Sequence, residues 1–293
     1  MRKPFLTVFT PAYNRAYTLP RTYESMKIQK NADFIWLIVD DGSSDNTAEL
    51  VRQWQSEENG FEIRYIYKEN GGMHTAHNVA YALIDTELNT CVDSDDALAP
   101  DAVQLIADAW DKVRDKGYAG LLALDAEFDG TVIGKGFPED LTETTLGGYY
   151  RNGGKGDKKL ILRTDVVRQY PLYPTFEGER FVPLGSLYTL IDKDYQLSVL
   201  DAVVCLVEYM PDGSTHNMVR QYYRNPNGFR YSRLVALTGP TTLKQKLKLY
   251  IHYAAESILS HRPIVKDAPN KLLGFLSIPF GAVLAAHIRK RCK

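Results

Sequence analysis

Residues 91–100 read Cys91-Val92-Asp93-Ser94-Asp95-Asp96-Ala97-Leu98-Ala99-Pro100, with three carboxylates in four positions between a strand-like run and a helical pattern. Alternate side chains of an extended segment share a face, so Asp93 and Asp95 should point the same way. Two carboxylates this close repel unless a cation lies between them, and Mg²⁺ is usually held by one or two carboxylates plus substrate phosphates. We therefore expect a site for a metal-bound diphosphate. The alternative is a polar loop that caps a helix beginning near Pro100.

The composition is that of a globular protein. With 293 residues, 44% of them hydrophobic and 24% charged, the chain is long enough for one large α/β domain or two small ones. A net charge of −1 provides no global basic field, which argues against nucleic-acid binding. Cys91, Cys205 and Cys292 are too scattered for a disulfide framework or a zinc site and favour a reducing compartment. The strand pattern that starts at Phe5 leaves no room for a signal peptide, so we expect a cytoplasmic protein.

Short apolar runs alternate with helical patterns over the first hundred residues. We expect strands at 5–9, 34–39, 61–67 and 88–92, and helices at 19–28, 47–56 (N-cap Ser44 or Asp45) and 74–84. This alternation predicts an α/β fold, a mostly parallel sheet with helices on both faces. Ligands of such sheets lie beyond the carboxyl ends of the strands. Those ends carry Thr10-Pro11, Asp40-Asp41, Asn70-Gly71-Gly72 and Asp93 to Asp95, which together predict a nucleotide site.

The rest of the chain is less regular. A helix is expected at 104–116 and strands at 121–126, 161–163 and 197–209. From about Thr242 the pattern becomes helical, with one side formed by Leu243, Leu247, Tyr250, Ile251, Ala254 and Ile258. We therefore expect a helical segment appended to the α/β domain.

With these strand ends assembled, the chain resembles family 2 glycosyltransferases of the GT-A (Rossmann-like) fold, among them bacterial transferases that build capsule or other surface polysaccharides. The resemblance is carried by Thr10-Pro11-Ala12-Tyr13-Asn14-Arg15, Val39-Asp40-Asp41-Gly42-Ser43-Ser44-Asp45, Asn70-Gly71-Gly72 with Ala76 and Asn78, and Asp93-Ser94-Asp95-Asp96. It covers the first hundred residues well and about 230 loosely. It implies a GT-A catalytic domain at 1–230, with a donor half at 1–100 and an acceptor half at 101–230, followed by a helical extension at 231–293.

The resemblance also implies a nucleotide-sugar donor and a divalent metal, Mn²⁺ or Mg²⁺. The implied donor site comprises Thr10, Pro11, Tyr13, Arg15, Asp41, Asn70, Gly72, Asn78 and Asp93. In it Asp41, or Asp40, accepts the N3–H of uracil, while Tyr13 offers a face to the base and Arg15 a cation to the diphosphate. Asp95 is the principal metal ligand, Asp93 contacts the ribose or sugar and the metal, and Asp96 orients the loop. The ordinary alternatives are a turn residue at Asp41, an exposed Arg15 and a simple tight turn at Gly72.

In an inverting enzyme of this family the acceptor hydroxyl attacks the anomeric carbon while the nucleoside diphosphate leaves, and a carboxylate removes the proton. The family often places that base in a Glu-Asp pair, from which Phe176-Glu177-Gly178-Glu179-Arg180-Phe181 departs. Glu179 is our candidate for the base and Glu177 the second choice; alternatively, both merely pair with Arg180. His216 follows the last expected strand and either completes the metal shell or is solvated.

The segment from Leu272 to Ile288 contains no Asp, Glu, Lys or Arg and is followed by Arg289-Lys290-Arg291. As a helix its 17 residues would reach about 25 Å, short of the roughly 30 Å hydrocarbon core. We therefore expect an interfacial helix with a basic end, peripheral on the inner face of the cell membrane. The alternative is a helix packed on the catalytic domain. Membrane association would suit an acceptor linked to a polyprenyl diphosphate, which the resemblance implies.

Together these observations predict a metal-dependent, inverting glycosyltransferase of the hexosyltransferase type that uses a UDP-sugar and a glycan acceptor. A sugar nucleotidyltransferase would need a glycine- and basic-rich loop after the first strand, and residues 10–15 contain no glycine. A transferase-like domain without activity, which only binds glycans or partners, is the other alternative. The presence of Asp41, Asp93 and Asp95 argues against it.

Overall fold

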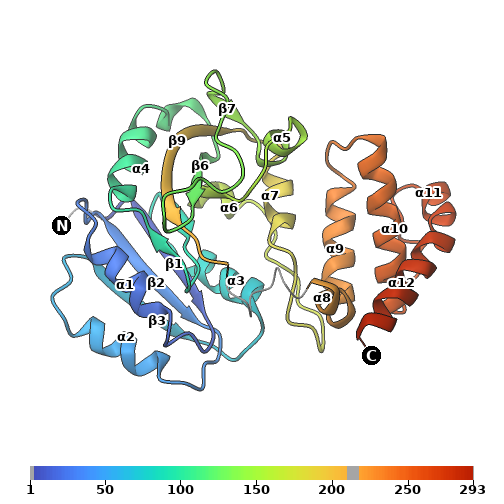
Figure 1. Ribbon diagram of the computed structural model, residues 1–293, viewed down its shortest axis with the longest axis horizontal. Coiled ribbons are helices and arrows are strands. Elements are labelled where there is room, and N and C mark those ends of the chain that lie inside the picture. Colours follow the sequence, from blue (N-terminus) through green and yellow to red (C-terminus); the bar gives the residue numbers. More distant parts are fainter. Residues whose placement is uncertain (1–2, 210–217, 293) are drawn as a thin grey trace. The chain divides into compact units, whose positions relative to one another are not determined.

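The computed structural model describes residues 3–209 and 218–292 (Figure 1). Its contacts divide the chain into two compact units, Met1–Pro171 with Asp194–Glu208 and Leu172–Lys193 with Tyr209–Lys293. This division differs from the boundary expected at residue 230. The segment Leu172–Lys193 and the helices from Met218 onward belong with the helical tail.

The first unit is built on one sheet. Its strands are β1 (Leu6–Ala12), β2 (Phe34–Asp40), β3 (Glu62–Tyr67), β4 (Leu88–Cys91), β5 (Ala97–Leu98), β6 (Gly120–Ala126), β7 (Glu143–Thr144), β8 (Lys158–Arg163) and β9 (Leu197–Leu206). The sheet order is β3-β2-β1-β4-β8-β6-β9-β5, with β7 paired to β9. Strands β3, β2, β1 and β4 run parallel, and β8 lies antiparallel between β4 and β6. Most paired residues lie in parallel ladders, which confirms the predicted mostly parallel sheet.

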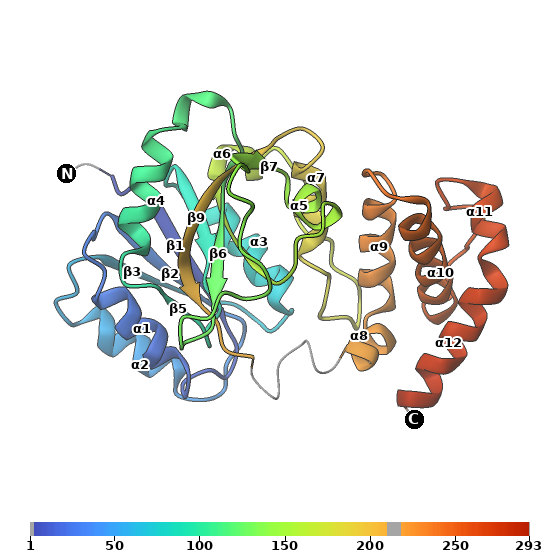
Figure 2. The same ribbon diagram turned by 45° about the horizontal axis from the view of Figure 1, so that its top comes forward.

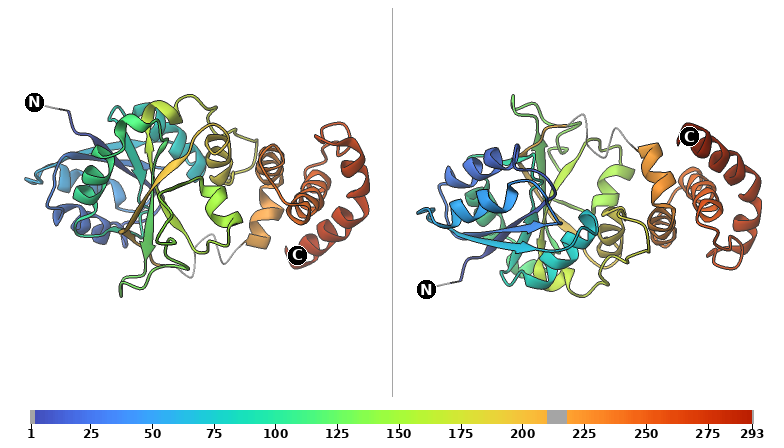
Figure 3. Two further views of the ribbon diagram at one scale, coloured as in Figure 1. Left: turned by 90° about the horizontal axis from the view of Figure 1, so that it is seen from above. Right: turned by 90° about the horizontal axis from the view of Figure 1, so that it is seen from below.

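Helices cover both faces of this sheet. They are α1 (Leu19–Lys27), α2 (Thr47–Gln55), α3 (Met73–Leu83), α4 (Ala102–Asp111), a 3₁₀ turn at Arg114–Lys116, α5 (Leu146–Arg151) and α6 (Thr164–Val167). Figures 2 and 3 show α3 on the opposite side of the sheet from α1 and α2. Strand alternation explains the two layers, because Leu6 and Val8 share one core cluster with residues of α1, α2 and α4, whereas Phe9 contacts rings of α3.

Strand β1 continues to Ala12, so the end of this strand predicted at Phe9 is wrong. Pro11 is tolerated in this central strand for a geometric reason. The carbonyl of Phe9 accepts a hydrogen bond from the Val92 amide (3.0 Å), so Phe9 and Pro11 direct their backbone groups toward β4. Pairing with β4 ends at Phe9 and Cys91. The missing N–H of Pro11 therefore lies where the ladder needs no donor.

The helices predicted at 19–28 and 47–56 are present, with differences at their ends. The N-cap residue of α2 is Asn46, so the predicted N-cap at Ser44 or Asp45 is wrong. Asp45 still accepts hydrogen bonds from the amide (3.1 Å) and hydroxyl (2.6 Å) of Thr47. In α1 the apolar residues Leu19, Tyr23 and Met26 are buried, whereas Ile28, which follows the helix, is 56% exposed.

The second unit is helical in its described residues. It contains α7 (Gly185–Ile191), α8 (Met218–Arg224), α9 (Pro226–Ala236), α10 (Leu243–Leu259), α11 (Lys271–Leu276) and α12 (Ile278–Cys292). Helix α10 confirms the predicted helical tail, although Leu243 and Leu247 of its expected buried side are exposed. Across the described chain, the helices are too short or too polar to cross a membrane.

Candidate functional site

The two aspartates that end and follow β2 point to opposite faces of the sheet. Asp40 accepts hydrogen bonds from the Ser43 amide (2.8 Å) and the Tyr65 hydroxyl (2.6 Å). Burial, followed by this contact with Asp40, raises the pKa of Tyr65. Asp41 lies on the α3 side, where its carboxylate meets the turn that begins α3. Of the two candidates for a nucleobase contact, only Asp41 therefore adjoins the Gly71-Gly72 turn.

The carboxylate of Asp41 organises this turn. One oxygen accepts from the Gly71 amide (2.9 Å) and from Lys68, and the other accepts from the Gly72 amide (2.7 Å). The Asn70 side chain donates to the Asp41 carbonyl (2.8 Å). An ionised carboxylate offers about four acceptor positions. Three are used, so one acceptor position remains for a further N–H donor.

Two glycines are required at this turn. Gly72 has φ +92° at the N-cap of α3. Gly42, in the neighbouring loop, has φ +85°, and a Cβ there would lie 2.7 Å from the Asn70 amide nitrogen, too close to be accommodated. His74, on the first turn of α3, is buried, and Nδ1 has no hydrogen-bond partner. Burial lowers the pKa of His74 to about 4. Asn78 lies half-buried further along the helix.

The loop after β1 is tied to the loop after β2. The Asn14 amide donates to the Ser43 hydroxyl (2.8 Å), and the Asn14 side chain accepts from the Ser44 amide (2.8 Å). Tyr13 is 47% exposed, which leaves its ring available for a base. Thr10 is buried, and its hydroxyl accepts from the Trp36 indole (3.0 Å), so this side chain belongs to the core. Pro11 is likewise buried within β1.

The carboxylates that follow β4 form a compact turn. The Asp96 amide donates to the Asp93 carbonyl (3.0 Å), and the Asp96 carboxylate accepts from the Glu208 amide (3.3 Å). Asp93 and Asp95 are half-buried, whereas Asp96 is buried. Burial, and then the charge of Asp93, raises the pKa of Asp95, and burial raises the pKa of Asp96 to about 8. Both carboxyl groups are therefore harder to ionise in this turn than in water.

Two arginines from the amino-terminal part of the chain, Arg15 and Arg21, act on the Asp93 to Asp96 turn. The charges of Arg15 and Arg21 both favour the ionised form of Asp95, against the effect of burial on its pKa. Arg15 donates to the Tyr17 hydroxyl (2.7 Å). Arg21, on α1, donates to the Asp95 carbonyl and pairs with Glu208. The sequence predicted Arg15 but not Arg21, which stands on α1 with no motif to mark it.

A lysine lies beneath the same turn. Lys159 of β8 donates to the Cys91 carbonyl (3.3 Å), and its ammonium nitrogen is 3.8 Å from a carboxylate oxygen of Asp125 on β6. Although burial opposes it, the carboxylates around Lys159, Asp125 foremost and then Asp96 and Asp93, hold its pKa well above the usual range. Sequence reasoning missed Lys159 and Asp125. The only available signal was a pair of lysines opening a strand that is otherwise largely apolar.

The residues present suit a divalent metal only in part. Among residues 3–209 and 218–292, no group of three or more His, Cys, Asp or Glu side chains is arranged to hold an ion. Asp93 and Asp95 offer hard oxygen donors of the kind Mg²⁺ accepts together with substrate phosphates. The predicted ligand His216 lies outside the described residues. The described chain therefore supplies two carboxylates, and donor phosphates would supply further ligands.

The candidate base Glu179 belongs to the second unit, whereas the donor-side residues belong to the first. Its carboxylate accepts from the amide (2.9 Å) and side chain (2.7 Å) of Asn227 and from the Gly228 amide (2.9 Å), at the first turn of α9. Glu177 is exposed. Neither glutamate forms an ion pair with Arg180 in the described part of the chain.

Comparison with protein families and curated proteins gives a consistent result. Residues 7–126 match the family model described as Glycosyl transferase family 2. Hyaluronan synthase of Pasteurella multocida is 31% identical over 158 residues, which cover 51% of this chain and 16% of that protein. Chondroitin synthase of Escherichia coli is 33% identical over 136 residues, 46% of this chain and 20% of that protein. The matches thus span a fifth or less of these relatives.

Solved structures share the fold at low sequence identity. S. aureus TarS 1-349 in complex with UDP-GlcNAc superimposes with a TM-score of 0.63 at 15% identity, covering 97% of this chain and 91% of that one. The mannosyltransferase PcManGT from Pyrobaculum calidifontis, in complex with GDP-Man and Mn²⁺, gives a TM-score of 0.55 at 16% identity, covering 99% and 76%. These likenesses confirm the predicted fold.

Proposed function

Because the chain carries a family 2 glycosyltransferase domain of the GT-A fold, we propose that it transfers a sugar from a UDP-sugar to a glycan acceptor with inversion. The observation that carries the proposal is the placement of Asp41 and of the Asp93 to Asp96 turn. They follow β2 and β4, which flank β1 with all three strands parallel. The carboxyl ends of such strands are where α/β sheets bind ligands.

The nucleotide end of the donor belongs at Asp41. The remaining acceptor position of this carboxylate suits the N3–H of uracil, and the exposed ring of Tyr13 offers a stacking surface. Asn70, Gly72 and Asn78 form the turn and the helix that border this position. Structural neighbours solved with UDP and with UDP-GlcNAc support a uridine donor.

The diphosphate end belongs at the Asp93 to Asp96 turn. Asp95 and Asp93 would hold Mn²⁺ or Mg²⁺ together with the donor phosphates, with His216 as a further ligand, and Arg15 would contact the diphosphate. When bound, the metal neutralises charge on the departing nucleoside diphosphate. The neighbour that holds GDP-Man and Mn²⁺ supports the use of a metal.

Glu179 is proposed as the base that removes the proton of the acceptor hydroxyl. Amide donors of Asn227 and Gly228 hold its carboxylate in one orientation, and a general base must be held within reach of the proton that it removes. Glu177 is the second choice, since its exposed side chain makes no such contacts among the described residues.

The acceptor is proposed to be a glycan on a polyprenyl diphosphate, in bacterial surface polysaccharide synthesis. Relatives named for hyaluronan, chondroitin and teichuronic acid synthesis support a polysaccharide product. One relative is named as an undecaprenyl-phosphate transferase, which supports a lipid carrier. The cysteines Cys91, Cys205 and Cys292 are free thiols, which fits the proposed cytoplasmic location.

Calorimetry with UDP and with GDP, each with Mn²⁺ and with EDTA, tests the proposal. Metal-dependent binding of UDP alone is the expected result and would be followed by a screen of UDP-sugars for hydrolysis. Binding of GDP in place of UDP would overturn the uridine assignment. Equal binding in EDTA would overturn the metal assignment, and failure of both nucleotides to bind would overturn the donor site.

A further inference from the structure

Helices α11 and α12 expose a row of large apolar side chains. At helical spacing along one side, Leu272, Phe275, Leu276, Phe280 and Val283 are 66%, 62%, 53%, 62% and 72% exposed. We call these five residues the apolar row. An exposed apolar patch of this kind on a folded protein marks an interaction surface.

The apolar row is separate from the face by which α12 packs. Gly281, Ala285 and Ile288 of α12 are buried, and a Cβ on Gly281 would lie 2.5 Å from the Cβ of Ala254 on α10. One face of α12 therefore packs against α10 within the second unit. The apolar side chains of the other face are exposed and are not packed within this unit.

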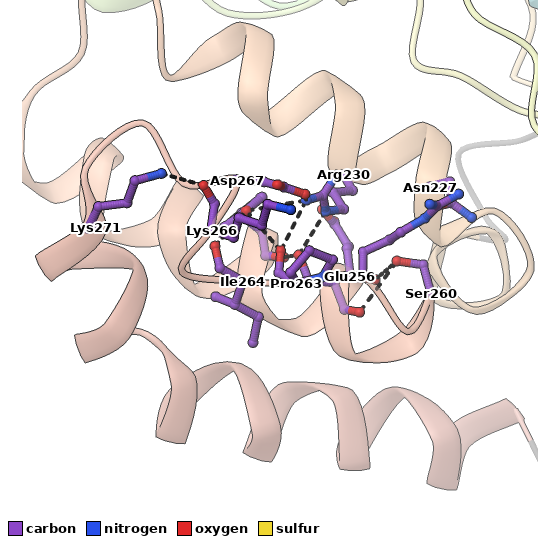
Figure 4. Close-up of polar contacts among 12 residues, drawn as sticks. Asn227, Arg230, Glu256, Ser260, Pro263, Ile264, Lys266, Asp267 and Lys271 are labelled. Atoms are coloured by element: carbon purple, nitrogen blue, oxygen red, sulfur yellow. Dashed lines mark hydrogen bonds and ion pairs between the residues drawn. The ribbon is translucent and has the colours of Figure 1, made fainter.

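The charge around the apolar row has one sign. Residues 243–293 contain ten Lys and Arg against two acidic residues, Glu256 and Asp267. Both acids are already paired, Glu256 with Arg233 (3.3 Å) and Asp267 with Arg230 (2.6 Å). Figure 4 shows Arg230 directed at Asp267 and at the Pro263 carbonyl. In the described chain, Arg289, Lys290 and Arg291 at the end of α12 form no ion pair.

We propose that the apolar row and the basic end of α12 bind the surface of an anionic lipid bilayer. The apolar side chains enter the interface between headgroups and acyl chains while Arg289, Lys290 and Arg291 contact lipid phosphates. A second copy of the same face is a poorer partner, because pairing two such faces would bring like charges together. The helices lie along the membrane, since neither is long enough to cross it.

Flotation with vesicles tests the apolar part of the proposal. The chain should float with vesicles of phosphatidylcholine plus phosphatidylglycerol and remain behind with phosphatidylcholine alone. Leu272→Ser combined with Phe280→Ser should reduce binding at least about tenfold, since each removes a buried apolar side chain from the interface. Leu172→Ser is the matched control: Leu172 is 58% exposed and lies outside the apolar row. Circular dichroism confirms that the variants remain folded.

The basic end of α12 has its own test. Arg289→Gln with Arg291→Gln should weaken binding to phosphatidylglycerol vesicles by about tenfold or more, because each cationic side chain near such a surface contributes about fivefold. Added salt should weaken the wild-type chain in the same direction. The control Lys112→Gln changes an exposed lysine on the first unit and should have no effect.

Three outcomes would overturn the proposal. The first is equal binding to both vesicle types, and the second is binding by the variant with Leu272→Ser and Phe280→Ser that is as strong as that of the wild type. The third is a dimer that Phe280→Ser dissociates, with no binding to vesicles. The last would assign the apolar row to contact between copies. Hydrolysis of the donor sugar nucleotide in solution should be unchanged in every variant. Absence of vesicle binding would therefore not contradict the proposed transferase function, and absence of hydrolysis would not contradict the proposed membrane-binding surface.

Discussion

The two units of this chain differ in net charge and in the kind of side chain that they expose. The first unit contains 19 Lys and Arg against 30 Asp and Glu, whereas the second contains 16 against six. The first unit gathers its carboxylates at the ends of parallel strands and ties the loops there with hydrogen bonds. The second leaves large apolar side chains exposed beside arginines. On the proposals made above, the donor site belongs to the first unit, and the proposed base and the membrane surface belong to the second.

The largest expected effect is the loss of catalytic activity on substitution of a residue in the first unit. Asp95→Ala should lower kcat at least about a thousandfold, because the charge on the leaving diphosphate loses several kcal/mol of stabilisation. It should also abolish the metal dependence of UDP binding measured by calorimetry. Asp111→Ala, at an exposed position of α4, is the control. Full turnover by the Asp95 variant would remove the Asp93 to Asp96 turn from the reaction.

The next effect shows whether the second unit also takes part in chemistry. Glu179→Gln should lower kcat about a hundredfold or more and leave UDP affinity unchanged, because a neutral amide cannot accept the acceptor's proton. The amide oxygen replaces only one of the two accepting oxygens, so one set of α9 donors loses its acceptor and the melting temperature should fall as well. Glu177→Gln is measured in parallel. A loss of kcat in the Glu177 variant alone would reverse the assignment of the base.

A smaller effect concerns the internal stability of the second unit. Arg230 donates to Ser257 (2.9 Å), the Pro263 carbonyl (3.2 Å) and Asp267 (2.6 Å), and only 13% of its side chain is exposed. Arg230→Met should lower the free energy of unfolding by about 2 kcal/mol, since charged hydrogen bonds are lost and acceptors are left unpaired. Urea titration followed by circular dichroism measures it. The exposed Arg52→Met should change little, and equal losses would contradict the argument.

The last effect is a pH dependence located in the first unit. The pKa of His74 is about 4 in the folded chain, below its usual 6.5. Between pH 6.5 and 4, His74 is therefore protonated in the unfolded chain and neutral in the folded chain. The free energy of unfolding falls as the pH drops through this range. His74→Gln should make this fall shallower by up to about 1.4 kcal/mol per pH unit. Parallel pH profiles of unfolding free energy for wild type and variant would contradict it.

The sequence predicted the parallel strands and the loops at their ends because apolar runs and turn residues are local signals. Periodicity placed β2, α3 and α10 to within a residue or two. It failed for Leu243 and Leu247, because the hydrophobic pattern of a helix does not say whether a partner exists to cover it. It ended β1 too early, because Pro11 is acceptable only where the neighbouring strand has already stopped.

Within the candidate site, the sequence showed the acidic residues and missed most of their cationic partners. Asp41, Asp93 and Asp95 stand in recognisable motifs, whereas Arg21, Lys68 and Lys159 reach the site from a helix, a loop and a distant strand. Such partners are set by strand order, in which β8 lies beside β4 although 66 residues separate Cys91 from Lys158. Local patterns carry no information about that neighbourhood.

The position of Lys159 has a consequence for the resting enzyme. Its ammonium lies under the carboxylates as a covalently attached counterion, 3.8 Å from Asp125 and bonded to the backbone at Cys91. In the proposed reaction, the nucleotide and its metal leave the site and return at each cycle of transfer. During the interval the acidic turn still has a cation beside it that cannot diffuse away. The chain should therefore tolerate chelators without unfolding, and loss of activity in EDTA should be fully reversible.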